Sequence, residues 1–233
     1  MRRRLLALIM AFCMVISLLP VTATADGNWI DSADTSWYTG AETDATEFTI
    51  DSAADLAGLA KLVNEGNSFS GKTIKLGADI DLGGKEWTPI GKSGATFNGT
   101  FDGNSKTISN LVINSPTKSD VGLFGFTQSG AVKNFTLNNA KVTGYLDVGA
   151  VAGTPYTSKY TNIAVTGLIQ VNGFSYVGGA FGKNAYANLT NVDVTGGEGS
   201  YVKADSVENG IAYRTYLGGL AGFMGEGKIA VSD

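Results

Sequence analysis

Hydrophobic and polar positions along the chain recur in a fixed order. Four six-residue stretches share one pattern, namely apolar, any residue, Asn, apolar, any residue, apolar. Their asparagines are 24, 28 and 29 residues apart (134 − 110, 162 − 134 and 191 − 162). Repetition at such a period is typical of solenoids, in which each repeat forms one coil. The stretches are Ile108–Ile113, Val132–Leu137, Tyr160–Val165 and Leu189–Val194.

A second element alternates with these stretches. Each copy starts with an apolar residue followed by Gly and ends with another Gly. Two interleaved repeats with one period indicate that each period is one structural turn. Before the last copy, residues 197–213 insert a polar stretch, which we interpret as a loop projecting from the coil. The copies are Val121–Gly125, Val148–Gly153, Val177–Gly182 and Leu217–Gly222.

The apolar positions change parity at each asparagine. Ile108 lies two residues before Asn110, whereas Leu111 and Ile113 follow it at odd offsets. A regular strand cannot point both sets inward, but one residue in the left-handed conformation, which Asn tolerates, restores the inward direction. Stacked coils lie about 4.8 Å apart, close enough for amides to bond to one another. We therefore predict a structural ladder of Asn110, Asn134, Asn162 and Asn191.

Upstream of the repeats, the pattern predicts one helix and one strand. Ser52 and Asp55 form a capping box, and Gly66 is suited to end the helix. The helix is expected to plug the open end of the coil with an apolar face of Leu56, Leu59, Ala60 and Val63. From Thr73 to Leu82 every second residue is apolar, which predicts a single half-buried strand.

The chain begins with the pattern of a secretory signal. Arg2, Arg3 and Arg4 precede an apolar run, and small residues follow it, so we predict a signal peptide over residues 1–25, cleaved after Ala25. The run from Leu5 to Leu19 is shorter than the roughly 20 residues of a membrane-spanning helix. These features predict a secreted or cell-surface protein whose mature chain does not insert into a membrane.

The mature chain divides into three predicted parts. Residues 26–47 form a polar leading segment with Trp29, Trp37 and Tyr38 as anchors. Residues 48–71 form a capping strand and helix, and residues 72–233 form the β-helix. Because residues 228–233 read as the opening of another repeat, we expect the β-helix to continue in a longer protein.

Composition removes several classes of chemistry. The chain has no His, and its one Cys, Cys13, belongs to the predicted signal, so Ser-His-Asp, thiol and common zinc chemistry are all missing. Without Arg2, Arg3 and Arg4 the mature chain has 14 basic and 21 acidic residues, a net charge near −7 (14 − 21). An acidic chain without a basic run is not suited to nucleic acid. We predict no enzyme activity and no required cofactor.

The ordered motifs resemble those of the GLUG-repeat proteins, which are secreted or surface-attached in bacteria. The resemblance covers residues 48–233 and rests on the glycine elements together with Gly71–Leu82, Trp87–Gly91 and Phe97–Gly103. It implies an all-β fold, a right-handed parallel β-helix with a short N-terminal capping helix. It implies little chemistry, since the repeat accompanies varied modules, among them immunoglobulin A metallopeptidases. Their His-Glu-x-x-His zinc motif has no counterpart here, because this chain has no His.

Three acidic residues are candidates for a metal-binding or catalytic site. Asp79 and Asp81 are predicted to share the outward face of one strand, with Asp102 one coil later. Carboxylates so placed are suited to binding Ca²⁺ or to acid/base chemistry. The alternative is structural, since Asp before Gly is ordinary turn chemistry and acidic residues are common on a solvated strand face.

Tyrosines crowd the later half of the chain. Tyr145, Tyr176 and Tyr216 each shortly precede a glycine element, so stacking is expected to align them as an aromatic strip able to pack on sugar rings. The alternative is that Tyr simply suits exposed strand positions. Tyr160 falls at an inward position and is predicted to be core. The tyrosines in this region are Tyr145, Tyr156, Tyr160, Tyr176, Tyr186, Tyr201, Tyr213 and Tyr216.

These observations favour an exported, non-enzymatic β-helical module for cell-surface adhesion or for binding a glycan or protein ligand, within a larger surface protein. Two alternatives stay open. One is a polysaccharide-active β-helix that uses Asp79, Asp81 or Asp102, and the other is a passive spacer to a downstream catalytic domain.

Overall fold

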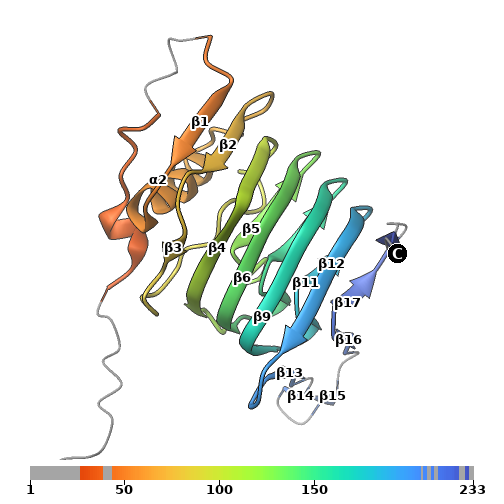
Figure 1. The fold of residues 1–233 in the computed structure, drawn as a ribbon. Coiled ribbons are helices and arrows are strands. Elements are labelled where there is room, and N and C mark those ends of the chain that lie inside the picture. The colour runs from red at the N-terminus through yellow and green to blue at the C-terminus, as the bar shows by residue number, and fades with distance from the viewer. Residues whose placement is uncertain are drawn as a thin grey trace, which may run out of the picture.

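The computed structural model describes residues 27–38, 44–205, 207–208, 211–212, 215–225 and 229–230. The predicted signal peptide, its cleavage site after Ala25 and Cys13 lie outside the described residues. Within them the chain is an all-β parallel β-helix with a single α-helix at its N-terminal end, as the sequence predicts (Figure 1). No described helix has the length and apolar character needed to cross a bilayer.

The α-helix, α2 (Ala53–Asn64), starts and covers the core as expected. The Asp55 amide donates to Ser52 Oγ and the Ser52 amide donates to Asp55 Oδ2, each at 3.1 Å, which completes the capping box. Leu56, Leu59 and Val63 on its buried face are fully buried in the same apolar core as the coils. The helix therefore covers apolar side chains that would otherwise face water at the open end of the β-helix.

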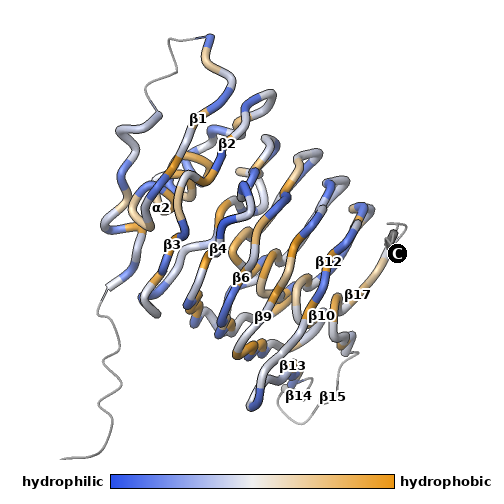
Figure 2. The backbone as a smooth tube through the Cα atoms, in the orientation of Figure 1, coloured by the Kyte–Doolittle hydropathy of each residue, from blue (hydrophilic) through white to orange (hydrophobic). Residues whose placement is uncertain are grey.

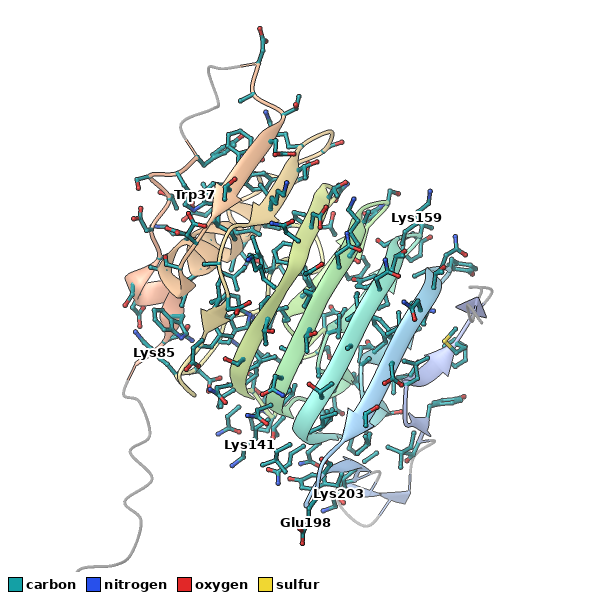
Figure 3. The ribbon with its side chains drawn as sticks, viewed as in Figure 1. Trp37, Lys85, Lys141, Lys159, Glu198 and Lys203 are labelled. Carbon is teal, nitrogen blue, oxygen red and sulfur yellow. The ribbon has the colours of Figure 1, made fainter. Side chains whose placement is uncertain are left out.

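The leading segment packs onto this N-terminal end. It contains the short 3₁₀ helix η1 (Trp29–Ser32), and Trp29 Nε1 donates to the Leu82 carbonyl at 2.9 Å. The Lys85 ammonium lies 4.7 Å from the centre of the Trp29 ring. Trp37 stacks on Phe69 with ring centres 6.1 Å apart (Figure 3). Aromatic anchors thus hold this polar segment against the body.

The longest sheet runs the length of the solenoid. Its strands pair in parallel in the order β1-β2-β4-β6-β9-β12-β18, with β3 beside β4 and β13 beside β9. Figure 1 shows these strands stacked side by side, and Figure 2 shows apolar and polar stretches alternating along them. The strands are β1 (Glu47–Ile50), β2 (Thr73–Leu76), β3 (Ile80–Asp81), β4 (Thr100–Asn114), β6 (Ala131–Thr143), β9 (Lys159–Gly173), β12 (Asn188–Gly196), β13 (Tyr201–Ala204) and β18 (Ile229–Ala230).

Two shorter parallel sheets close each coil, and the glycine elements form the corner between them. A β-carbon on Gly153 would lie 2.4 Å from the Asp120 carbonyl carbon, so only glycine fits where these backbones touch. One sheet has the order β16-β10-β7 and the other β17-β11-β8-β5. Their strands are β7 (Leu146–Gly149), β10 (Ser175–Gly178), β16 (Leu217–Gly218), β5 (Phe124–Gln128), β8 (Ala152–Tyr156), β11 (Phe181–Asn184) and β17 (Ala221–Met224).

Two local predictions are wrong. Residues Thr73–Leu82 form two strands, because the chain bends at Ala78. At the neighbouring Gly77, the Asp51 carboxylate occupies the space of a side chain. Ile80 and Leu82 are buried, so alternate side chains still point inward after the bend. The polar insertion over residues 197–213 is more than a loop, since it contains β13 and an antiparallel pair, β14 (Val207–Glu208) with β15 (Ile211–Ala212).

The asparagine ladder exists, but its first member is misplaced. Asn162 Nδ2 donates to Asn134 Oδ1 at 3.0 Å, and Asn191 Nδ2 donates to Asn162 Oδ1 at 2.9 Å. Asn110 belongs to a second ladder, in which it donates to Asp81 at 2.8 Å and accepts from Asn139 at 3.2 Å. The four asparagines therefore do not form one column.

The physical reason is that a coil bends twice within one long strand. Asn134 and Asn139 both lie in the left-handed region, with φ of 60° and 59°, and the two bends are five residues apart (139 − 134). Asn110 occupies the second bend, so it stacks on Asn139 rather than Asn134. The separation of 29 residues (139 − 110) matches the period, whereas the separation of 24 does not.

Candidate functional site

The candidate binding surface is a groove on the outer face of the β17-β11-β8-β5 sheet. We call it the aromatic groove. It encloses about 530 Å³. Its walls are mainly apolar, and Lys183 is the only charged side chain among the described residues that line it. The lining residues are Phe126, Thr154, Tyr156, Lys183, Ala185, Tyr186, Phe223 and Gly225.

The groove is built by the corner that each glycine element makes. In each coil, the residue directly after the second glycine lies on the outer face, and these residues stack in register. Phe126 pairs with Thr154, and Lys183 pairs with Phe223. The residue after Lys183, Asn184, is fully buried. Stacking of equivalent positions therefore produces a continuous outer column from residues that are far apart in the sequence.

Four aromatic rings follow the groove, one from each of four successive coils. Phe126 comes from β5, Tyr156 from β8, Tyr186 from just after β11, and Phe223 from β17. The rings of Phe126 and Tyr156 are 6.3 Å apart, and those of Tyr156 and Tyr186 are 5.7 Å apart. Tyr156 is 36% exposed and Tyr186 is 49% exposed, so both present apolar ring surface to solvent. Such rings are suited to packing on a flat, partly apolar ligand.

Two carboxylates stand in a column behind one wall of the groove. Asp120 and Asp147 occupy equivalent positions in neighbouring coils, since the Val121 amide donates to the Asp147 carbonyl at 3.0 Å. Asp120 Oδ1 accepts a 2.6 Å hydrogen bond from the Thr154 hydroxyl, which lines the groove. Asp147 Oδ1 is buried and has no hydrogen-bond partner among the described residues.

Burial dominates the electrostatics of this pair. It raises the pKa of the Asp147 carboxyl to about 6, and the neighbouring Asp120 carboxylate adds to the rise while Lys183 opposes it. Burial also raises the pKa of Asp120, against the Thr154 hydrogen bond and the Lys183 charge. The Lys183 ammonium lies 5.4 Å from the centre of the Tyr176 ring. The Lys183 ammonium therefore opposes the rise in pKa at both carboxyls.

The predicted tyrosine strip is only partly formed. Tyr176 and Tyr216 stack with ring centres 4.7 Å apart and planes 4° from parallel. Tyr145 is not in their column, because it lies three residues before the Val of its glycine element, whereas Tyr176 lies one residue before its own. Tyr145 stacks instead on Phe174, at 5.0 Å, and Asp147 takes the place that corresponds to Tyr176.

The three predicted carboxylates do not converge on one site. Asp81 pairs with Ser109 in the next coil, whereas Asp102 pairs with Lys75 at the other end of the same long strand. The described residues contain no group of three or more His, Cys, Asp or Glu suited to holding a metal ion. The prediction that Asp102 lies near the other two is therefore wrong.

Each of these carboxylates has a structural partner. Asp79 Oδ1 accepts from the Thr107 amide at 2.8 Å. Hydrogen bonds from Asn110 and the Gly83 amide lower the pKa of Asp81. Burial raises the pKa of Asp102, but hydrogen bonds from the Asn104 amide and Asn134, with the Lys133 ammonium, lower it overall. Asp81 and Asp102 thus each accept the hydrogen bond at the end of one ladder.

The groove was not predicted from the sequence, because the prediction used the tyrosines that precede the glycine elements. The relevant signal lies after them. Tyr156 follows Gly153 by three residues, Tyr186 follows Gly182 by four, and Phe126 follows Gly125 directly. An aromatic residue shortly after the second glycine of successive repeats predicts rings on one outer face.

No protein-family model matches the chain, and no solved structure matches it. Two known proteins are similar to it. Halomucin from Haloquadratum walsbyi is 37% identical over 164 residues, covering 65% of this chain and 2% of halomucin. A protein from Evansella cellulosilytica, named as a Gly-rich membrane protein, is 30% identical over 200 residues, covering 71% of this chain and 23% of that protein. The chain therefore spans only a small part of the length of either relative.

Proposed function

We propose that this protein is an exported, surface-displayed β-helical module that holds an extended glycan in the aromatic groove without cleaving it. The observation that carries the proposal is the ring contributed to the groove by each of four successive coils. Phe126, Tyr156, Tyr186 and Phe223 supply these rings.

The geometry of a β-helix suits a linear polymer. Neighbouring coils are about 4.8 Å apart, close to the advance of one sugar along an extended glycan, so successive sugars meet successive coils. A ring packed against the apolar face of a sugar contributes about 0.5–1.5 kcal/mol. Polar atoms in the wall, the Thr154 hydroxyl and the Lys183 ammonium, are available to sugar hydroxyls. A glycan running along the solenoid axis therefore meets a ring in each of the four coils and a polar side chain in the two middle ones.

The setting of the module supports display outside the cell. The N-terminal residues have the pattern of a secretory signal, and one relative is named as a membrane protein. The ordered glycine elements and the long asparagine strands also support membership of the GLUG-repeat proteins. A non-catalytic role is supported by the absence of His from the whole sequence.

Length dependence of binding tests the proposal. Neutral 1→4-linked oligosaccharides of one to six sugars are titrated into the purified chain by calorimetry. Affinity is expected to rise with each added sugar up to about four and then level off, because the outer sheet has four strands. Replacing Tyr156→Ala and Tyr186→Ala together is expected to weaken binding roughly ten- to a hundredfold.

A matched variant separates the groove from general surface effects. Tyr201 lies on β13, is 45% exposed and does not line the groove. Tyr201→Ala is expected to leave the affinity unchanged. If the double variant binds as tightly as the natural protein, or if no glycan, neutral or acidic, binds at all, the proposal fails and a spacer role is favoured.

One observation favours a second candidate, glycan cleavage. Asp120 and Asp147 are two carboxylates in neighbouring coils, and Asp147 has a pKa near 6 through burial. Paired carboxylates with separated pKa values are typical of glycosidases. Release of reducing ends from a polysaccharide panel, lost in Asp147→Asn, would establish this candidate over the non-catalytic one.

A further inference from the structure

We infer that the aromatic groove selects uncharged glycans and rejects polymers of uronic acids, because Asp120 and Asp147 give one of its walls a net negative charge. The inference rests on the proposed function and goes further by naming the ligand class. It depends on charge, whereas the proposed function depends on the rings.

Both carboxylates are coupled to side chains that line the groove. Asp120 is one hydrogen bond of 2.6 Å away from the lining, through the Thr154 hydroxyl. Asp147 occupies the equivalent place one coil further on, and its charge interacts with the Lys183 ammonium. The two acids therefore stand directly behind neighbouring positions of the groove wall.

Lys183 does not neutralise this pair. It is the single charged residue of the lining, and it forms no ion pair within the part of the chain that the structure describes. Its ammonium lies 5.4 Å from the centre of the Tyr176 ring, and its charge opposes the rise in the pKa of both Asp120 and Asp147. Among the described residues, one positive and two negative charges leave a net charge of −1 at this wall.

Because Asp120 and Asp147 are partly buried, their negative charges act on a ligand in the groove with little screening. Charges shielded from solvent are screened less by salt than exposed ones, and Asp147 Oδ1 is buried with no hydrogen-bond partner in the described part of the chain. A glycan carboxylate in the groove would add a third negative charge beside them. A neutral sugar meets no such penalty, and its hydroxyls find the Thr154 hydroxyl in the wall.

The test compares two probes of equal length against the full chain. One is a neutral 1→4-linked hexasaccharide of glucose or xylose, and the other is a 1→4-linked hexamer of galacturonate, both at about 20 mM salt. The natural protein is expected to bind the neutral probe at least about tenfold more tightly, since like charges brought together weaken association. Asp147→Asn is expected to reduce that ratio, and Lys183→Met to increase it.

Asp193→Asn serves as the charge-matched control, because Asp193 is exposed on β12, outside the aromatic groove. Its ratio of affinities is expected to equal that of the natural protein. The inference is overturned if galacturonate binds as tightly as the neutral probe, or if Asp147→Asn leaves the ratio unchanged. Binding of neither probe is a different result, because it refutes the proposed function itself.

Discussion

The half-buried Asp147 carboxyl is expected to destabilise the fold more at neutral than at acidic pH, and Asp147→Asn is expected to remove that one contribution. Its Oδ1 has no hydrogen-bond partner among the residues that the structure describes, and burial raises its pKa from 3.8 to about 6. Asn has nearly the same shape and also tolerates the left-handed conformation that residue 147 adopts, with φ of 57°. The substitution therefore changes charge with little change in backbone strain.

The sign follows from proton binding. Between pH 3.8 and about 6 the folded state binds more protons at residue 147 than the unfolded state does, so the free energy of unfolding falls as pH rises through this window. A difference of about two pKa units corresponds to about 3 kcal/mol, at 1.36 kcal/mol per unit. Because part of the side chain still contacts solvent, we expect Asp147→Asn to stabilise the fold by about 1–2 kcal/mol at pH 8. At pH 4 the gain is expected to be near zero.

Urea denaturation followed by circular dichroism at pH 4, 5, 6 and 8 measures this difference. The quantity of interest is the free energy of unfolding of the variant minus that of the natural protein at each pH, which cancels contributions from other groups. Asp193→Asn, at an exposed carboxylate, is expected to differ by less than about 0.5 kcal/mol throughout. Equal differences at pH 4 and pH 8 would refute the reasoning, and so would a variant less stable than the natural protein at pH 8.

Substitutions at four further positions probe the scaffold through the same denaturation assay. Asn134→Ala is expected to lower the free energy of unfolding by about 2–4 kcal/mol, because it removes ladder hydrogen bonds and strains a left-handed position. Asn134→Gly is expected to lose only the hydrogen-bond contribution, because glycine adopts the left-handed conformation without strain. Equal losses in the two variants would contradict a role for the bend. Gly153→Ala is expected to cost at least about 2 kcal/mol because its β-carbon meets backbone, while Gly219→Ala, with no atom within 4 Å, should be nearly neutral. Tyr160→Phe is expected to cost about 1 kcal/mol by leaving the buried Thr127 hydroxyl without its 2.8 Å partner, and a neutral effect would mean that the bond adds nothing.

The groove links these stability effects to binding. The glycine corners let each coil turn without a side chain between backbones, and that turn places the following residue on the outer face. Thr154 and Lys183 occupy such positions directly after Gly153 and Gly182. A glycine substitution that shifts one corner is therefore expected to disturb the groove as well as the core.

Much of the architecture follows from the sequence alone. The alternation of apolar residues, the parity change at each asparagine and the paired glycines indicate stacked coils, in which both sets of apolar side chains point inward. The capping box at Ser52 and Asp55 and the inward position of Tyr160 also follow from local pattern. These features depend on neighbours within a few residues, so the sequence contains the whole cause.

Register between coils was decided only in three dimensions. Asn110 shares the local motif of Asn134, yet it stacks on Asn139, because hydrogen bonds between coils select which of two bends aligns. The aromatic groove has the same origin. Its rings are separated by 30, 30 and 37 residues (156 − 126, 186 − 156 and 223 − 186), and the last interval is longer because of the insertion over residues 197–213. The rings also lie one, three or four residues after their glycines, so no fixed spacing in the sequence aligns them. Side chains meet across coils rather than along the chain, so contacts that form the binding surface become visible only once the coils are stacked.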